Sequence, residues 1–136
     1  MSASAELQKL AFDTMKGSPS VMAILNGVYD RVPADPFGAK TAYVSFGPSD
    51  VIDDSADCIT IGQHSLQIDV WSKAVGQVEA KRAVDIIYKL FHEQSFSLAE
   101  NALVQIRVDL RRVMPDRDPN LTHGIVTLSA TIEEPS

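Results

Sequence analysis

Residues 63–71, QHSLQIDVW, decide the fold, because their side chains alternate between two chemical characters along the whole stretch. Successive side chains of a strand point to opposite faces, so this pattern predicts a strand with one apolar and one polar face. Such a strand is typical of an antiparallel sheet that is covered on one side only. The apolar side holds His64, Leu66, Ile68 and Val70, and the polar side holds Gln63, Ser65, Gln67, Asp69 and Trp71.

Three more strands are expected, one before this stretch in the sequence and two after it. Residues 41–46 read TAYVSF, and residues 103–113 and 122–132 have apolar side chains at even positions. Helical spacing predicts a first helix that ends at Gly17, a short second helix that Asn26-Gly27 ends, and a third helix over residues 77–92. The expected fold class is therefore α+β, with a four-stranded, mainly antiparallel sheet, helices packed on one face, and the order ααββαββ.

The 136 residues suit a single domain over residues 1–136. Within it, residues 47–62 are acidic and poor in pattern, so we expect a long loop there. Loops of this length in small domains often carry function. The loop is a candidate docking segment through Asp50, Asp53, Asp54 and Asp57.

The overall charge narrows the function classes. Twelve basic against 18 acidic side chains give a net charge of −6. A general nucleic-acid binder is disfavoured, because such proteins neutralise phosphates with clustered cations. No apolar run approaches the length of a membrane span, so we expect no membrane contact. The single cysteine, Cys58, allows no internal disulfide.

No catalytic, cofactor-binding or metal-binding set is predicted. Alternation places His64 and His123 on opposite faces of the sheet, which disfavours a shared metal site. The aspartates of residues 47–62 lack the spacing of a calcium loop. Two alternatives stay open: a small α+β enzyme that uses His64 or His123 with a carboxylate, and a module that binds a small ligand in an apolar cavity.

Candidate contact residues lie on the polar face of the sheet. Arg107, Arg111 and Arg112 are expected on or near this face, and Trp71 lies on it at a strand end. Arg and Trp are favoured at protein interfaces. The arginines either pair with nearby aspartates as a solvated face or contact a partner, and Trp71 is either exposed or covered by a neighbouring loop.

Four segments resemble the tail-completion family of tailed bacteriophages, also described as tail terminator or tail-to-head joining proteins. They occur in the family's order along nearly the whole chain. Ala42 stands where the family usually has Pro, and Asn120-Leu121 where a Gly is common. The segments are VYDRVP (28–33), TAYVSFG (41–47), HSLQIDVWSKAVGQVEA (64–80) and VMPDRDPNLTHGIVTL (113–128).

The resemblance implies a structural protein without enzymatic activity or cofactor, found in phages, prophages or gene transfer agents. It implies an α+β subunit that forms a homo-hexameric ring at the head–tail junction of the virion. The ring caps the tail tube, ends its polymerisation, contacts the head-side connector or stopper protein, and lets DNA pass without specific binding. A different head–tail connector or a minor tail protein is the alternative within this class.

Overall fold

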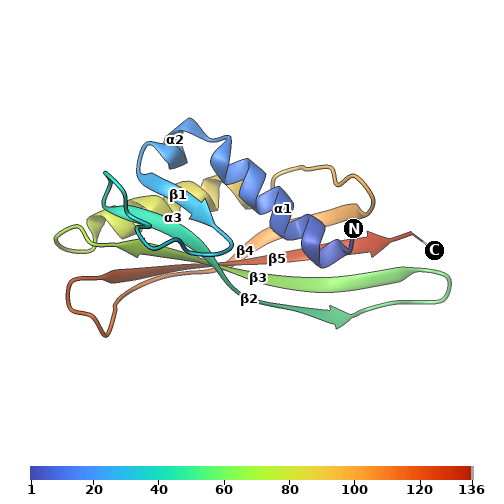
Figure 1. Ribbon diagram of the computed structural model, residues 1–136. Coiled ribbons are helices and arrows are strands. Elements are labelled where there is room, and N and C mark those ends of the chain that lie inside the picture. The colour runs from blue at the N-terminus through green and yellow to red at the C-terminus, as the bar shows by residue number, and fades with distance from the viewer. Residues whose placement is uncertain (136) are drawn as a thin grey trace.

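A computed structural model describes residues 1–135 as one five-stranded sheet with three helices on one face (Figure 1). No helix among these residues lies on the other face. The strand order across the sheet is β1-β2-β3-β5-β4. The elements are α1 (Ala3–Lys16), α2 (Pro19–Met22), β1 (Leu25–Tyr29), β2 (Ala42–Asp53), β3 (Thr60–Ser72), α3 (Val78–Phe91), β4 (Ala102–Pro115) and β5 (Thr122–Glu134).

The α+β class and the helices on one face agree with the prediction, but the four-stranded sheet was wrong. Leu25–Tyr29 forms a fifth strand that pairs in parallel with β2, so the sheet is mixed and the order is ααβββαββ. Asn26-Gly27 does not end a helix, since α2 stops at Met22. Asn26 instead lies in β1, where its side-chain amide donates to the carbonyl of Pro36 at 2.9 Å and holds the following loop.

The core lies between the helices and the inner face of the sheet. Both long helices present an apolar stripe, which α1 forms with Leu7, Ala11 and Met15. In α3, Val84 lies against Gly124 of β5, where an added Cβ would come within 2.8 Å of a Val84 methyl. This close approach sets how deeply α3 sits on the sheet. The fully buried side chains of the core include Phe91, Met15, Leu25, Leu66, Ile68, Ile87, Ile106, Leu128 and Ile132.

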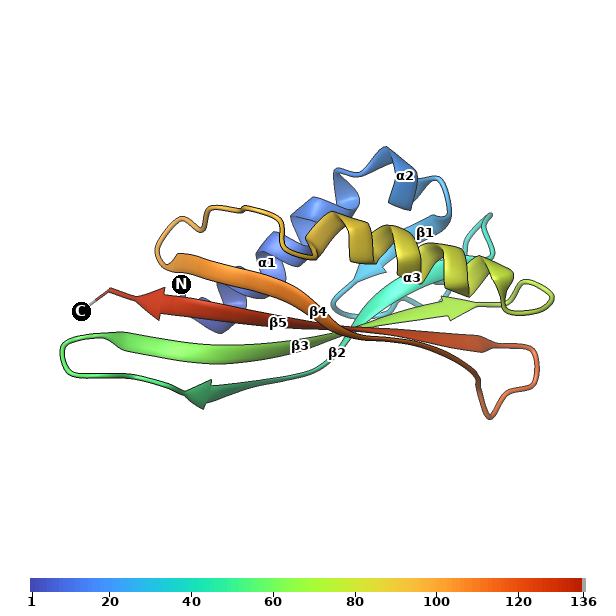
Figure 2. The same cartoon turned by 180° about the vertical axis from the view of Figure 1, so that it is seen from behind.

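The expected loop over residues 47–62 is mostly strand. β2 continues to Asp53 and β3 begins at Thr60, so only residues 54–59 connect them. A register shift between Phe46 and Ser49 changes the phase of the alternation, which hides the strand in the sequence. The resulting β2–β3 hairpin extends beyond the helices, beside the C-terminal end of β5 (Figures 1 and 2).

Strand β4 also contains two register shifts, one between Leu103 and Gln105 and one between Val108 and Leu110. Each shift reverses which side chains face the helices. The expectation of a continuous apolar face at even positions is therefore wrong at both ends of β4. Ile106 and Val108 are buried, whereas Val104 is 60 % and Leu110 39 % exposed.

Candidate assembly surface

The uncovered face of the sheet has a neutral polar centre. Three side chains of β3 and three of β5 line it, all partly buried by their neighbours. Thr131 donates its hydroxyl to the Gln63 amide oxygen at 2.7 Å, so the hydrogen bonds run between strands. These side chains carry no formal charge, so this part of the face has little attraction for phosphates. They are Gln63, Ser65, Gln67, Thr127, Ser129 and Thr131.

Trp71 lies on this face but is covered by a neighbour rather than free. Its ring stacks on His123 with centroids 4.0 Å apart and planes 8° from parallel. Its indole N–H donates to the Ser45 hydroxyl at 3.0 Å. Asp69 completes the group, since its Oδ1 lies 2.7 Å from His123 Nε2. The alternation of each strand by itself does not predict this cluster, but pairing the two alternating strands gives the register that places Trp71 opposite His123.

His64 faces the helices and not the open face, as the alternation predicts. It is 3 % exposed, and neither ring nitrogen has a hydrogen-bond partner among the described residues. Burial lowers the pKa of His64, while the charge of Glu134 acts in the opposite direction. With His123 on the other face, the two histidines do not form a common site.

The four aspartates of the hairpin are exposed and do not form a metal site. Asp53 accepts a hydrogen bond from Ser55 at 2.6 Å, and Asp54 accepts one from the Gln63 amide at 3.1 Å. Residues 1–135 contain no group of three or more His, Cys, Asp or Glu side chains arranged to hold a metal ion. Apolar side chains accompany these aspartates: Val51, Ile52 and Ile59 are 46 %, 69 % and 41 % exposed.

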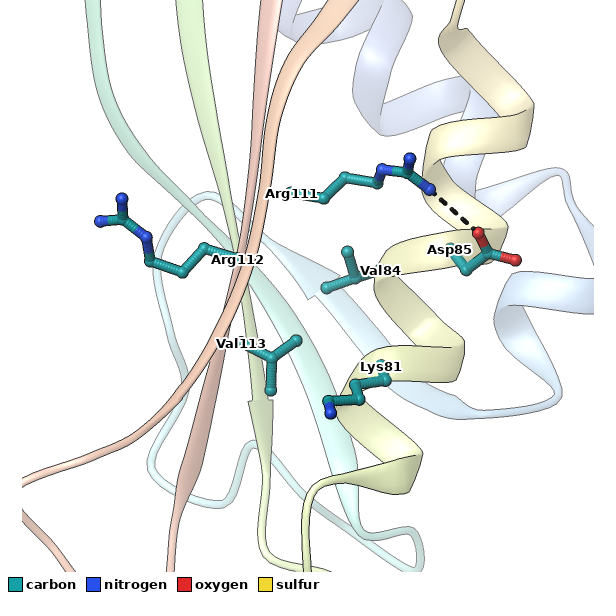
Figure 3. Close-up of a pocket in the computed structure, with 6 residues that line it drawn as sticks. All are labelled: Lys81, Val84, Asp85, Arg111, Arg112 and Val113. Atoms are coloured by element: carbon teal, nitrogen blue, oxygen red, sulfur yellow. Dashed lines mark hydrogen bonds and ion pairs between the residues drawn. The ribbon is translucent and has the colours of Figure 1, made fainter.

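The three arginines of β4 divide between the two faces. Arg111 points toward α3, where it donates to Asp85 at 3.1 Å (Figure 3). Its guanidinium carbon also lies 3.8 Å from the ring centre of Tyr88. Its placement on the polar face was therefore wrong, and the register shift after Val108 is the reason. Arg112 points to the opposite side (Figure 3), and Arg107 is paired with Ser129 on the open face. Neither has an ion-pair partner within the described chain.

A hollow between α3 and β4 is lined by Lys81, Val84, Asp85, Arg111, Arg112 and Val113 (Figure 3). It lies at the edge of the sheet and is open to solvent. The Asp85–Arg111 pair occupies one side of it. Only Val84 and Val113 of its lining are apolar, so this hollow lacks the mainly apolar walls of a small-ligand site.

Residues 12–133 match the protein family described as "Tail completion protein gp17". The chain belongs to this family. It is thus a structural tail protein and not an enzyme, which confirms the resemblance noted in the sequence. No curated protein matches the chain. No helix among residues 1–135 is long and apolar enough to cross a membrane.

A solved structure shares the fold of this tail completion protein. It is a chain of the "Virion of native gene transfer agent (GTA) particle", with a TM-score of 0.87 and 24 % sequence identity. The match covers 98 % of this chain and 99 % of the other. The similarity extends over nearly the whole of both chains, so the β2–β3 hairpin belongs to the shared fold.

Proposed function

We propose that this tail completion protein forms a hexameric ring at the head–tail junction, caps the tail tube and ends its polymerisation. In this role it binds the tail tube protein on one side and the head-side connector or stopper protein on the other. The family membership supports a role in the tail. The observation that carries the finer assignment is the β2–β3 hairpin, which extends beyond the helices and exposes apolar side chains.

The hairpin has the properties of a docking element. Ile52 is 69 % exposed on an acidic strand that has no Lys or Arg near it in the sequence, since none occurs between residues 41 and 72. Exposed apolar side chains grouped on one projecting element are typical of interaction sites. In the ring this hairpin contacts the tube or the neighbouring subunit, through Asp50, Asp53, Asp54 and Asp57 together with Val51, Ile52 and Ile59.

The charge of the chain suits a conduit for DNA. A net charge of −6 for each copy disfavours phosphate binding. DNA therefore crosses the ring without specific binding.

Shortening the hairpin tests the capping role. Residues 55–60 are replaced by Asn-Gly, which favours a tight turn between Asp54 and Ile61 and leaves the pairs of β2 and β3 up to Asp53–Gly62 in register. We expect an unchanged circular dichroism spectrum and overlong tails in electron micrographs of particles complemented with this variant. Tails of normal length joined to heads would contradict the proposal.

A binding assay separates this function from that of another connector or minor tail protein. Purified protein is mixed with tail tube protein and, separately, with the head-side connector. A tail terminator binds the open end of tubes, and the shortened hairpin reduces this binding. Binding to the head-side protein alone would favour the connector assignment.

A further inference from the structure

The sheet has two free edges of opposite charge. The first, here the acidic edge, is the outer half of β2, which β1 does not cover because β1 pairs only as far as Ser45. The second, here the basic edge, is β4. The acidic edge consists of Asp50, Val51, Ile52 and Asp53, and the basic edge of Val104, Arg107, Leu110 and Arg112, with one exposed carboxylate, Asp109, beside Arg107.

Both edges combine charge with exposed apolar side chains. Val51 and Ile52 accompany the aspartates, and Val104 and Leu110 accompany the arginines. Arg107 and Arg112 have no carboxylate within ion-pair distance among residues 1–135, so their charges are available to a partner. The two edges cannot meet within one chain, because β3 and β5 lie between them.

The strand register places one aspartate and one arginine at the same level of the sheet. Asp50 pairs with Ser65, Ser65 with Ser129, and Ser129 with Arg107. Directly paired residues share a face of an antiparallel sheet, so both charged side chains point to the open face. A rotation about an axis along the strands would bring Asp50 of one copy next to Arg107 of the following copy.

The direction of the strands fits such a rotation. Three successive antiparallel pairings lead from β2 through β3 and β5 to β4, so β2 and β4 run in opposite directions. In copies related by rotation about the strand direction, the acidic edge is antiparallel to the basic edge that it meets. Contact between two acidic or two basic edges would instead place like charges together, which disfavours a two-fold dimer.

Part of the basic edge already has backbone partners. The Glu93 N–H donates to the carbonyl of Ile106 at 3.0 Å, and the Val108 N–H donates to His92 Nδ1 at 3.0 Å. At this level the contact with a neighbouring copy is therefore made by side chains such as Arg107. Side-chain contacts of opposite charge with apolar neighbours give a specific register.

We infer that the acidic edge of one copy binds the basic edge of the next, head to tail, and that this contact closes the ring. The inference rests on the proposed ring and names the surfaces that build it. A head-to-tail contact of this kind is heterologous. It forms a closed ring when a whole number of the rotations between successive copies makes one full turn.

Charge exchange provides a direct test. One variant carries Asp50→Arg, so the facing positions of both its edges are basic, and a second carries Arg107→Glu, so both are acidic. We expect neither to form a ring alone, and an equimolar mixture to form rings with equal amounts of the two in native mass spectrometry. The control is Asp35→Arg, an exposed change outside both edges. Rings from either variant alone would overturn the inference.

Disulfide trapping separates this contact from the ring itself. In a Cys58→Ser background, Asp50→Cys and Arg107→Cys are combined, and the protein is oxidised with and without tube protein. We expect a covalent ladder that ends at the size of the ring, while each single cysteine variant stays monomeric on a denaturing gel. Rings in micrographs without this ladder would overturn the edge contact, but the proposed function would still stand. The absence of rings even with tube protein would overturn both.

Discussion

At the scale of single residues, His64 makes folding depend on pH. Burial lowers the pKa of His64, and both ring nitrogens lack partners. An unfolded histidine takes up a proton below about pH 6.5 that the folded form does not bind. The free energy of unfolding therefore has its full value above this pH. It decreases as the pH falls toward the lower, folded-state pKa of His64.

Replacing His64 with leucine tests this pH dependence. His64→Leu removes two buried nitrogens without partners and should raise the free energy of unfolding at pH 7 by about 1 kcal/mol. It should also reduce the loss of stability between pH 7 and 5. Urea unfolding at several pH values measures both effects, and an identical pH profile for the variant would contradict this role.

Glu6 provides an opposite pH dependence. Burial alone would raise the pKa of Glu6, but hydrogen bonds from the Asn101 side chain and from the backbone N–H groups of Glu100, Ala99 and Asn101 lower it below its ordinary value. The stabilisation is present above the unfolded carboxyl pKa of about 4.3. It is lost as the pH falls through the folded-state pKa, because protonation weakens the acceptor.

The substitution Glu6→Gln measures this contribution. The variant places an amide N–H₂ against donors and should unfold at a lower temperature at pH 7. The difference from the natural protein should shrink below about pH 4. Glu133→Gln is the matched control, since Glu133 is exposed. A difference that is constant with pH would show that the carboxylate charge is not responsible.

At the scale of elements, Gly124 controls the packing of α3 on the sheet. A Cβ there would lie 2.8 Å from Val84 Cγ2 and 3.2 Å from Val70 Cβ. We expect Gly124→Ala to lower the free energy of unfolding by about 1–3 kcal/mol through overpacking. Adding Val84→Ala should recover part of this loss if the two positions are coupled. Ser129→Ala on the open face is the control, and an equal cost for it in urea unfolding would refute this explanation.

The helices and strands also show which parts of the fold local sequence patterns can predict. Alternation located β3 and β5, and helical spacing located α3, because each keeps one phase along its whole length. β1 was missed because five residues that include Gly27 give too short a pattern. The distal part of β2 was missed because its register shift breaks the alternation.

Register shifts also explain which candidate residues the sequence placed on the correct face of the sheet. The sequence correctly placed His64 and His123 on opposite faces, since β3 and β5 contain no register shift. It misplaced Arg111, because the shift in β4 depends on pairing with β5, which no local pattern of β4 contains. The sequence can therefore name the charged residues of an edge, but the register decides which face each occupies.

At the scale of the whole molecule, the proposed contact between the acidic and basic edges predicts that ring assembly depends on salt. The Debye length falls from about 10 Å at 0.1 M to about 3 Å at 1 M salt, so attraction between the edges weakens. The apolar contacts of Ile52 and Val104 are not screened. We expect the fraction of protein in rings, at fixed protein concentration, to decrease as NaCl is raised from 0.1 to 1 M.

A variant with neutral side chains at both facing positions separates the electrostatic from the apolar contribution to the edge contact. The variant Asp50→Asn with Arg107→Gln keeps the shape of the edges but removes the charges that face each other. It should form fewer rings at low salt and lose less on addition of NaCl, as measured by sedimentation velocity. Equal salt sensitivity of this variant and the natural protein would place the responsible charges elsewhere. In that case the ring would be held by a contact that does not involve Asp50 and Arg107.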